Sequence, residues 1–177
     1  FDRVKHFMQG GNWRNFKVKY PEANRMYGRM MRISDLVDAI PRRGTAHQTA
    51  AASLYKAQCN CAYWHGVFGG IYFPFLRNAI YHHLIEAEAE AEKALGNRTA
   101  WPYADETDVD LDGIPEIRLS NPSINLFLAP ALGGAMVELD LVAKRRNLMA
   151  TMTRRPEPYH DEILRTPAAG AEDGIVS

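Results

Sequence analysis

The sequence predicts an α+β protein, in which a bundle of about three long helices is followed by part of an antiparallel β-sandwich. Apolar residues recur at helical spacing through roughly the first half of the chain. Beyond it, short apolar segments alternate with turn sequences such as Asp112-Gly113 and Gly133-Gly134. We therefore expect a helical region at residues 1–97, a linker at 98–106 and a sheet region at 107–177.

The helical region begins with two segments of different character. Phe1 to Phe16 has helical spacing but is interrupted by Gly10-Gly11, and the aromatic residues from Trp13 to Tyr20 are expected in an exposed loop. Pro21 to about Ile40 is expected to be a helix, because proline favours the first turn and an apolar stripe follows at spacings of three and four.

Two further helices are expected on the same grounds. One runs from near Thr45 through an alanine-rich stretch to Lys56, and its small residues allow close approach to its neighbours. The other runs from Tyr72 to Leu95, where an apolar stripe lies beside the acidic run Glu86-Glu88-Glu90-Glu92. We expect this run to form a solvated acidic face.

Short strands are expected after the linker. Turn residues and edge prolines separate them. The expected strands are Val109–Leu111, Glu116–Leu119, Ile124–Leu128 and Ala135–Leu141.

Composition excludes several classes of partner. The formal net charge of the 177 residues is zero, which disfavours nucleic-acid binding. No apolar run approaches the roughly 20 residues of a membrane span and no secretory leader is present, so no membrane partner is expected. Cys59 and Cys61 are too close in sequence for a helical disulfide, which favours reduced thiols and a cytoplasmic location. The chain looks cut at both ends, since it starts at Phe1 within an amphipathic segment and stops after a loop.

The segment from Gln58 to Gly70 is the strongest candidate for a functional site. It places Asn60, Tyr63, Trp64 and His65 close together beside a glycine pair. An indole offers a flat apolar face for a sugar ring, while amide and imidazole groups can bond the hydroxyls. The competing interpretation is that these aromatic residues are core residues at the end of a helix, as most large aromatic residues are.

A metal site is the second candidate. Asp108, Asp110 and Asp112, followed by Gly113, resemble the start of a calcium loop, in which oxygen ligands alternate before a sharp turn. The pattern then fails, because Leu119 stands where a bidentate glutamate is needed. Glu116 could serve in another geometry, and a turn with unpaired surface aspartates is the alternative. Apart from this possible Ca²⁺, no cofactor is expected.

Three groups of residues give the chain a resemblance to glycoside hydrolase family 57, of the 4-α-glucanotransferase and α-amylase type. The first comprises Asn12 to Phe16 and Lys19 to Asn24, and the second runs from Ala57 to Gly70. The third lies in the sheet region and includes the run Arg154 to His160. They occur in the order found in the family and span nearly the whole chain.

The resemblance implies that residues 1–97 follow a catalytic barrel and that the C-terminal β-sandwich begins after them. It implies a retaining enzyme acting on α-1,4-glucan or maltooligosaccharide, whose two catalytic carboxylates lie in the barrel of the same polypeptide. No part of this chain matches the barrel motifs, so no catalytic residue is expected here. Asn60, Tyr63, Trp64 and His65 would bind substrate. Cys61 stands where the family is expected to have aspartate.

Two other functions stay open on the sequence alone. The chain could be a non-catalytic glucan-binding module that has no barrel. It could also be a structural unit in which all the aromatic residues are core.

Overall fold

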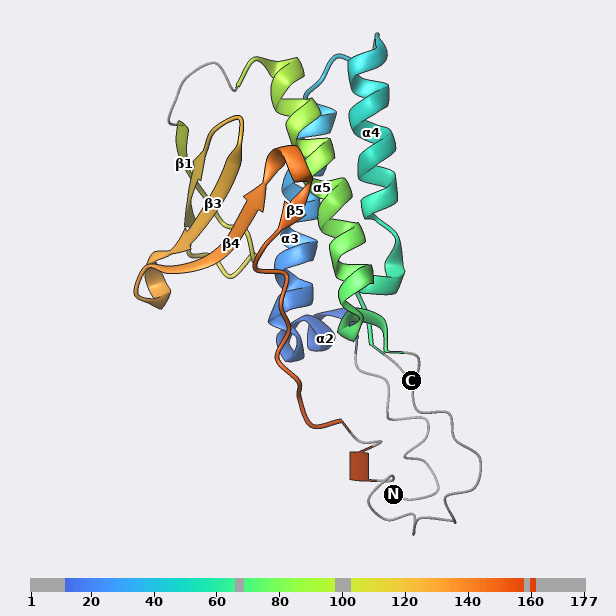
Figure 1. Ribbon diagram of the computed structural model, residues 1–177, viewed down its shortest axis with the longest axis vertical. Coiled ribbons are helices and arrows are strands. Elements are labelled where there is room, and N and C mark those ends of the chain that lie inside the picture. The colour runs from blue at the N-terminus through green and yellow to red at the C-terminus, as the bar shows by residue number, and fades with distance from the viewer. Residues whose placement is uncertain (1–11, 66–68, 98–102, 158–159, 162–177) are drawn as a thin grey trace.

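The structure is a computed structural model that describes residues 12–65, 69–97, 103–157 and 160–161. It confirms the α+β class, because a five-stranded antiparallel sheet lies against a group of packed helices (Figure 1). The sheet is a meander in which each strand pairs with the next along the chain. Most of the first expected helical segment, Phe1 to Gly11, lies outside the described residues.

The three long helices follow the sequence prediction. They are α3 (Pro21–Asp38), α4 (Thr45–Ala57) and α5 (Pro74–Leu95). The prolines that begin α3 and α5 stand in the first turn, where a missing backbone N–H has no intrahelical partner to lose. The facing sides of these helices form the apolar core of the molecule.

Helix α2 (Trp13–Lys19) corrects the expected exposed loop. The side chain of Asn12 caps it by accepting a hydrogen bond from the backbone N–H of Asn15, at 3.1 Å. This cap satisfies a donor that would otherwise lack a partner at the helix start. The cap lies just after the glycine pair that was expected to end the preceding segment.

The strands lie close to their expected positions, with two corrections. Val109–Leu111 is a bend, in which Leu111 has a φ of 60°, and it forms no strand. The first strand instead lies at residues 103–107, so it occupies the end of the expected linker. The strands are β1 (Tyr103–Thr107), β2 (Glu116–Ser120), β3 (Ile124–Ala129), β4 (Ala135–Leu141) and β5 (Arg146–Asn147).

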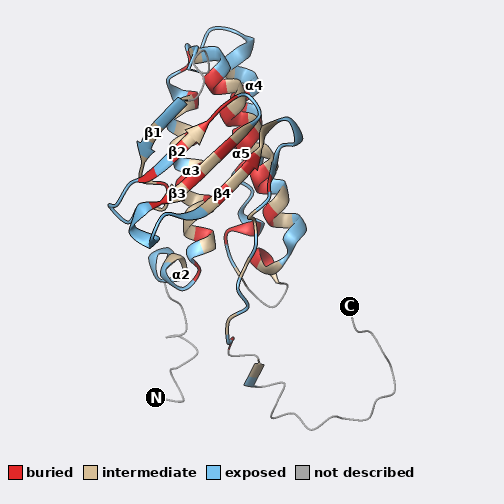
Figure 2. Cartoon of the chain, turned by 60° about the vertical axis from the view of Figure 1, so that its left-hand side comes forward, coloured by how far each residue is buried: buried red, intermediate tan, exposed pale blue. Residues whose placement is uncertain are grey.

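The two faces of the sheet invert the usual pattern. Buried residues alternate with less buried ones along the strands (Figure 2). The buried positions, which face the helices, are mostly polar: Glu116, Arg118, Ser120, Asn125, Glu138 and Asp140 beside Phe127. The opposite face is apolar and partly exposed, with Ile117, Leu119, Ile124, Leu126, Leu128, Met136, Leu139 and Leu141. An apolar outer face is what a second sheet of a sandwich would cover. The five strands therefore fit one part of such a sandwich.

Arg29 of α3 joins the helices to the sheet. Its guanidinium donates to both carboxylate oxygens of Glu88 on α5, at 3.0 and 2.8 Å. It also donates to Glu138 at 2.7 Å and to Asp140 at 3.1 Å, both on β4. All four side chains are fully buried. One arginine is thus neutralised by carboxylates from both layers.

The acidic run of α5 is therefore not the solvated face expected from the sequence. Glu88 and Glu92 are buried, and Arg118 of β2 pairs with Glu92. Four buried carboxylates face three arginines in this network, whose cations are Arg29, Arg118 and the partly buried Arg32. The excess acid is on β4, where one oxygen each of Glu138 and Asp140 is buried without a hydrogen-bond partner.

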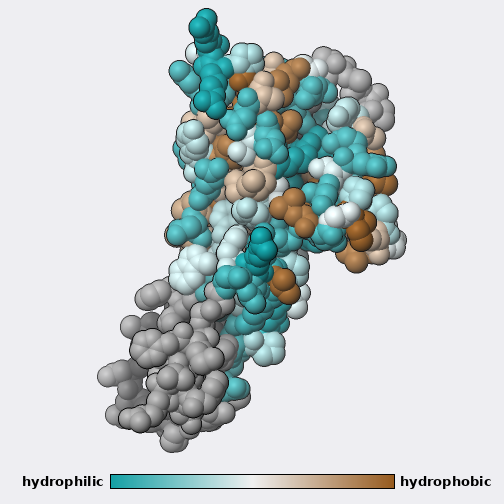
Figure 3. Space-filling view, turned by 180° about the vertical axis from the view of Figure 1, so that it is seen from behind, coloured by the Kyte–Doolittle hydropathy of each residue, from teal (hydrophilic) through white to brown (hydrophobic). Residues whose placement is uncertain are grey.

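Outside this interface the surface is mixed. Seen from behind, apolar side chains reach the surface on the sheet side of the molecule among hydrophilic neighbours (Figure 3). Among the described helices, none combines the length and the apolar character that crossing a bilayer requires.

We expect Asp140→Asn to raise the melting temperature at pH 8 and to leave it nearly unchanged at pH 4. Burial and the neighbouring Glu138 raise the pKa of Asp140 well above its usual value. Stability from the protonated acid is then complete below the unfolded-state pKa of about 3.9 and is lost as pH rises through the raised pKa. Asparagine keeps the shape and removes this loss. Thermal melts followed by circular dichroism measure it.

Glu88→Gln is the control of opposite sign. Burial alone would raise the pKa of Glu88, but Arg29, Arg118 and Arg32 outweigh it and hold the pKa well below the usual value. The variant should lose on the order of 3 kcal/mol at neutral pH, because it leaves buried cations without a full partner. Identical pH profiles for Asp140→Asn and the wild type would contradict the assignment of the excess acid.

Candidate functional site

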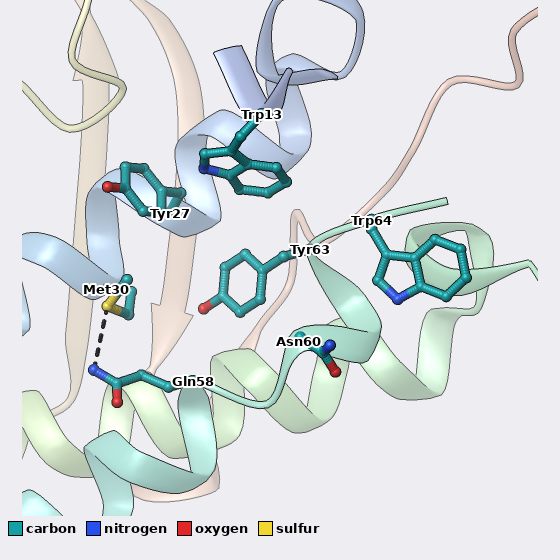
Figure 4. Close-up of a pocket in the computed structure, with 7 residues that line it drawn as sticks. All are labelled: Trp13, Tyr27, Met30, Gln58, Asn60, Tyr63 and Trp64. Atoms are coloured by element: carbon teal, nitrogen blue, oxygen red, sulfur yellow. Dashed lines mark hydrogen bonds between the residues drawn. The ribbon is translucent and has the colours of Figure 1, made fainter. Parts of the chain in front are cut away.

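We call the candidate segment from Gln58 to Gly70 the central motif. A hollow of about 390 Å³ lies where α2, α3 and the end of α4 meet this motif (Figure 4). Its walls are mainly aromatic, and its size is within the range of small-molecule sites. The lining residues are Trp13, Tyr27, Met30, Gln58, Asn60, Tyr63 and Trp64. The hollow contains three of the four substrate-binding residues predicted from the sequence.

Helix α2 supplies one wall through Trp13. The indole stacks on Phe16 with ring centroids 5.4 Å apart, and it meets the edge of Tyr27 at 6.0 Å. These contacts fix the ring while leaving 39% of the residue exposed. Lys17 places its ammonium 4.2 Å from the centre of the Tyr27 ring, so a cation lies beside this wall.

Tyr63 forms the floor. It is only 7% exposed, and its hydroxyl donates to the carbonyl of Ala57 at 2.8 Å. Burial raises the pKa of Tyr63, so the phenol stays neutral. The ring rather than the hydroxyl is what Tyr63 offers to a ligand.

Trp64 and Asn60 lie at the rim. Trp64 is 41% exposed, so of the two neighbouring aromatic residues Trp64 is the one open to solvent. Asn60 is exposed and begins the short 3-10 helix Asn60–Ala62. In the view of Figure 4 the Asn60 amide lies below the rings of Tyr63 and Trp64.

His65 lies apart from the hollow. Its Nδ1 is 2.9 Å from the carbonyl oxygen of Gly69. Its ring makes a T-shaped contact with Tyr72, with the ring centroids 4.6 Å apart. His65 does not line the hollow with Trp64. Its role as a hydroxyl partner stays a prediction.

The segment that carries Trp64 and His65 is folded back on itself. The backbone N–H of Ile71 donates to the carbonyl of Trp64 at 2.8 Å. Gly70 makes this possible: it has a φ of 51°, and a Cβ there would lie 2.1 Å from the same carbonyl oxygen. The glycine pair that ends the motif thus fixes the position of the Trp64 backbone.

The carboxylates that cluster at the predicted metal site differ in one residue from those expected. Ligand atoms of Asp108, Asp110 and Glu116 lie within 4.8 Å of one another. Asp112 is instead part of the turn, where it accepts from the N–H of Ile114 at 2.7 Å, while Asp108 accepts from two backbone N–H groups. The bend therefore brings Glu116 to the cluster in place of Asp112. Three clustered carboxylates are oxygen ligands of the kind that Ca²⁺ takes.

Another group of potential ligands lies on α5. Ligand atoms of His82, His83 and Glu86 are within 4.8 Å of one another. Glu86 already accepts from Ser53 at 3.0 Å and pairs with Arg145 at 3.0 Å. These contacts give Glu86 a structural role between α4, α5 and the sheet region.

Sequence reasoning missed the wall opposite Trp64. The sequence predicted a loop at Trp13, and it did not single out Tyr27 or Met30 as site residues. The cap sequence Asn12-Trp13-Arg14-Asn15 was the available signal, because asparagine is favoured at a helix start. The contact between α2 and the central motif spans about fifty residues and left no local pattern.

Two family models match this chain. The family model described as the middle domain of alpha-amylase/4-alpha-glucanotransferase matches residues 11–91. The model described as the C-terminal domain of the same proteins matches residues 108–177. The hollow lies within the first range, whereas β2 to β5 and the carboxylate cluster lie in the second.

Individual alpha-amylases and 4-alpha-glucanotransferases are similar to nearly the whole of this chain. A 4-alpha-glucanotransferase of Thermococcus kodakarensis is 39% identical over 100% of this chain and 25% of its own length. An alpha-amylase 1 of Dictyoglomus thermophilum is 39% identical over 92% of this chain and 23% of its own length.

The crystal structure of 4-alpha-glucanotransferase from Thermococcus litoralis superimposes with a TM-score of 0.71 at 38% identity, over 91% of this chain and 23% of that protein. The chain thus spans about a quarter of the length of the relatives it matches. Over residues 11–91 and 108–177 the chain is thus similar to the middle domain and the C-terminal domain of alpha-amylase/4-alpha-glucanotransferase proteins.

Proposed function

We propose that this chain forms part of the substrate cleft of an enzyme that acts on α-1,4-glucans, of the glycoside hydrolase family 57 type. The catalytic carboxylates would lie in a barrel elsewhere in the same polypeptide. The observation that carries the proposal is the aromatic hollow between Trp13 and Trp64. The names of the relatives, alpha-amylase and 4-alpha-glucanotransferase, support glucan or maltooligosaccharide as the substrate.

The chemistry of the hollow suits a glucose unit. A sugar ring presents C–H groups on its faces, which stack on an exposed indole such as that of Trp64. The hydroxyls around the ring need donors and acceptors, and the amides of Asn60 and Gln58 can supply both. Tyr63 would support the sugar from below through its ring.

Cys61 bears on how strongly the site binds. Its thiol is 3.7 Å from the amide oxygen of Asn60 and is exposed. A thiol is a weaker hydrogen-bond partner than a carboxylate, which the family resemblance implies at this position. We expect Cys61 to orient Asn60 less firmly than an aspartate would. The free, exposed thiols of Cys59 and Cys61 also support a reducing, cytoplasmic location.

In the complete polypeptide, Trp64→Ala should lower kcat/KM on maltooligosaccharides more than about tenfold, or about 1.4 kcal/mol of transition-state stabilisation. The reason is the loss of the stacking face at the rim of the hollow. Steady-state kinetics with a maltooligosaccharide series measures the effect. Tyr55→Ala is the matched control, since Tyr55 is an exposed aromatic residue of α4 outside the hollow. Equal kcat/KM for Trp64→Ala and the wild type would rule out the stacking role.

Calcium at Asp108, Asp110 and Glu116 is tested through stability. Burial and nearby acids raise the pKa of Asp110, and burial followed by Asp110 raises that of Glu116. Ca²⁺ binds ionised carboxylates, so the stabilisation by Ca²⁺ should grow as rising pH deprotonates Asp110 and Glu116.

We expect millimolar calcium to raise the melting temperature at pH 7 but not at pH 4, and Asp110→Asn to remove the effect. In EDTA the same variant should be more stable than the wild type at pH 7, because it relieves the repulsion between carboxylates. If calcium leaves the wild-type melting temperature unchanged at pH 7, the cluster is only a turn with surface acids.

A further inference from the structure

The carboxylate of Glu157 collects hydrogen bonds from two distant parts of the chain. It accepts from the hydroxyl of Tyr20 at 2.5 Å and from the ammonium of Lys19 at 2.6 Å, both at the end of α2. It also accepts from the hydroxyl of Tyr72 at 2.9 Å, at the end of the short 3-10 helix Gly70–Tyr72. We call these four residues (Lys19, Tyr20, Tyr72 and Glu157) the clasp.

The two parts that the clasp joins carry the two tryptophans of the hollow. Trp13 is on α2, only one or two turns before Lys19 and Tyr20. Trp64 is bound through its carbonyl to Ile71, the residue before Tyr72. Glu157 therefore contacts the far end of each wall without lining the hollow itself.

The ring contacts around the clasp reinforce this link. Tyr20 and Tyr72 meet at 6.2 Å in an edge arrangement, and the His65 ring lies against Tyr72. Phe16 packs on Tyr20 at 4.5 Å and also stacks on Trp13. A continuous path of aromatic contacts thus runs from the clasp to Trp13. The link to Trp64 is shorter, since one backbone hydrogen bond joins Trp64 to Ile71, the residue before Tyr72.

We propose that Glu157 is a positioning residue of the glucan site: it holds α2 and the Gly70–Tyr72 turn together and so sets the distance between Trp13 and Trp64. This inference rests on the proposed function for the ligand, but not for the geometry. On this proposal a residue from the C-terminal part of the chain fixes the distance between the two tryptophans of the hollow.

The charge of Glu157 is part of the mechanism. Burial alone would raise its pKa, but the hydrogen bonds from Lys19, Tyr20 and Tyr72 outweigh burial and leave the pKa below the usual value. The carboxylate is therefore ionised at neutral pH and accepts from all three donors. Glutamine has the same shape, yet its amide nitrogen cannot accept a hydrogen bond, so Glu157→Gln must lose at least one of these contacts.

Arg155 provides a matched control on the same segment. It pairs with Glu22 of α3 at 2.9 Å, which ties residues 153–155 to the helices. Arg155 also contacts the clasp, through its backbone N–H on the Tyr72 hydroxyl at 3.2 Å and its guanidinium 5.5 Å from the centre of the Tyr20 ring, but Glu22 takes part in neither contact. Glu22→Gln removes this neighbouring tie. Any effect of loosening the C-terminal segment as such should appear in Glu22→Gln as well.

The test of geometry is ¹⁹F NMR of the complete polypeptide labelled with 5-fluorotryptophan. The resonances of Trp13 and Trp64 are identified by their loss in Trp13→Phe and Trp64→Phe. Glu157→Gln should shift both resonances, whereas Glu22→Gln should shift neither. Tyr72→Phe removes one donor and keeps the ring, so it should shift the Trp64 resonance and leave that of Trp13 in place. If Glu157→Gln does not fold, Tyr72→Phe decides alone. Unchanged resonances in the folded variants would overturn the proposal.

The test of function is the affinity for maltoheptaose, measured by isothermal titration calorimetry on the same proteins. Glu157→Gln should weaken binding about tenfold, because the width of the hollow that accepts the sugar would then be populated only about a tenth of the time, while Glu22→Gln should bind as the wild type does. If the wild type itself binds no maltoheptaose but the ¹⁹F shifts appear, the proposed function fails and the clasp stands. If the wild type binds and Glu157→Gln binds equally well, the clasp is not a positioning device.

Discussion

The fold depends on how Arg29 is neutralised. A guanidinium with no exposed surface is tolerable only when carboxylates surround it, because an unpaired buried charge costs several kcal/mol. Glu88 comes from the same helical layer, whereas Glu138 and Asp140 come from the sheet. The sheet must therefore sit where β4 presents those two acids to α3. An apolar interface could slide, but this one is fixed by directional hydrogen bonds.

This interface explains which parts of the fold were readable from the sequence. The periodicity of α3, α4 and α5, and the turns around β2 to β4, depend on neighbours close in the chain, and they were predicted to within a few residues. The acidic run of α5 was misread, since Glu88 is 59 residues from Arg29 and nothing local distinguishes it from a solvated glutamate. The apolar positions of β2 to β4 correctly indicated strands, but they form the outer, partly exposed face of the sheet, whereas the polar positions between them are buried against the helices.

The site shows the same division. Asn60, Tyr63 and Trp64 stand in one unusual stretch of sequence, so composition and spacing alone drew attention to them. Trp13 completes the hollow from another helix, and no local signal connects the two. His65 adjoins Trp64 in sequence yet packs on Tyr72, because the chain reverses at the glycine pair. Adjacency in sequence therefore predicted a common site, but Trp64 lines the hollow and His65 does not.

Both charged centres of the molecule draw on the two matched ranges at once. Arg29 and Glu88 lie within residues 11–91, while Glu138 and Asp140 lie within 108–177. The clasp repeats this arrangement, with Lys19, Tyr20 and Tyr72 from the first range and Glu157 from the second. The helical part by itself would leave Arg29 with one carboxylate, and it would link the end of α2 to His65 and Tyr72 through the ring of Tyr20, without the hydrogen bonds of Glu157. The buried charges therefore join the two matched ranges into one structural unit around the site.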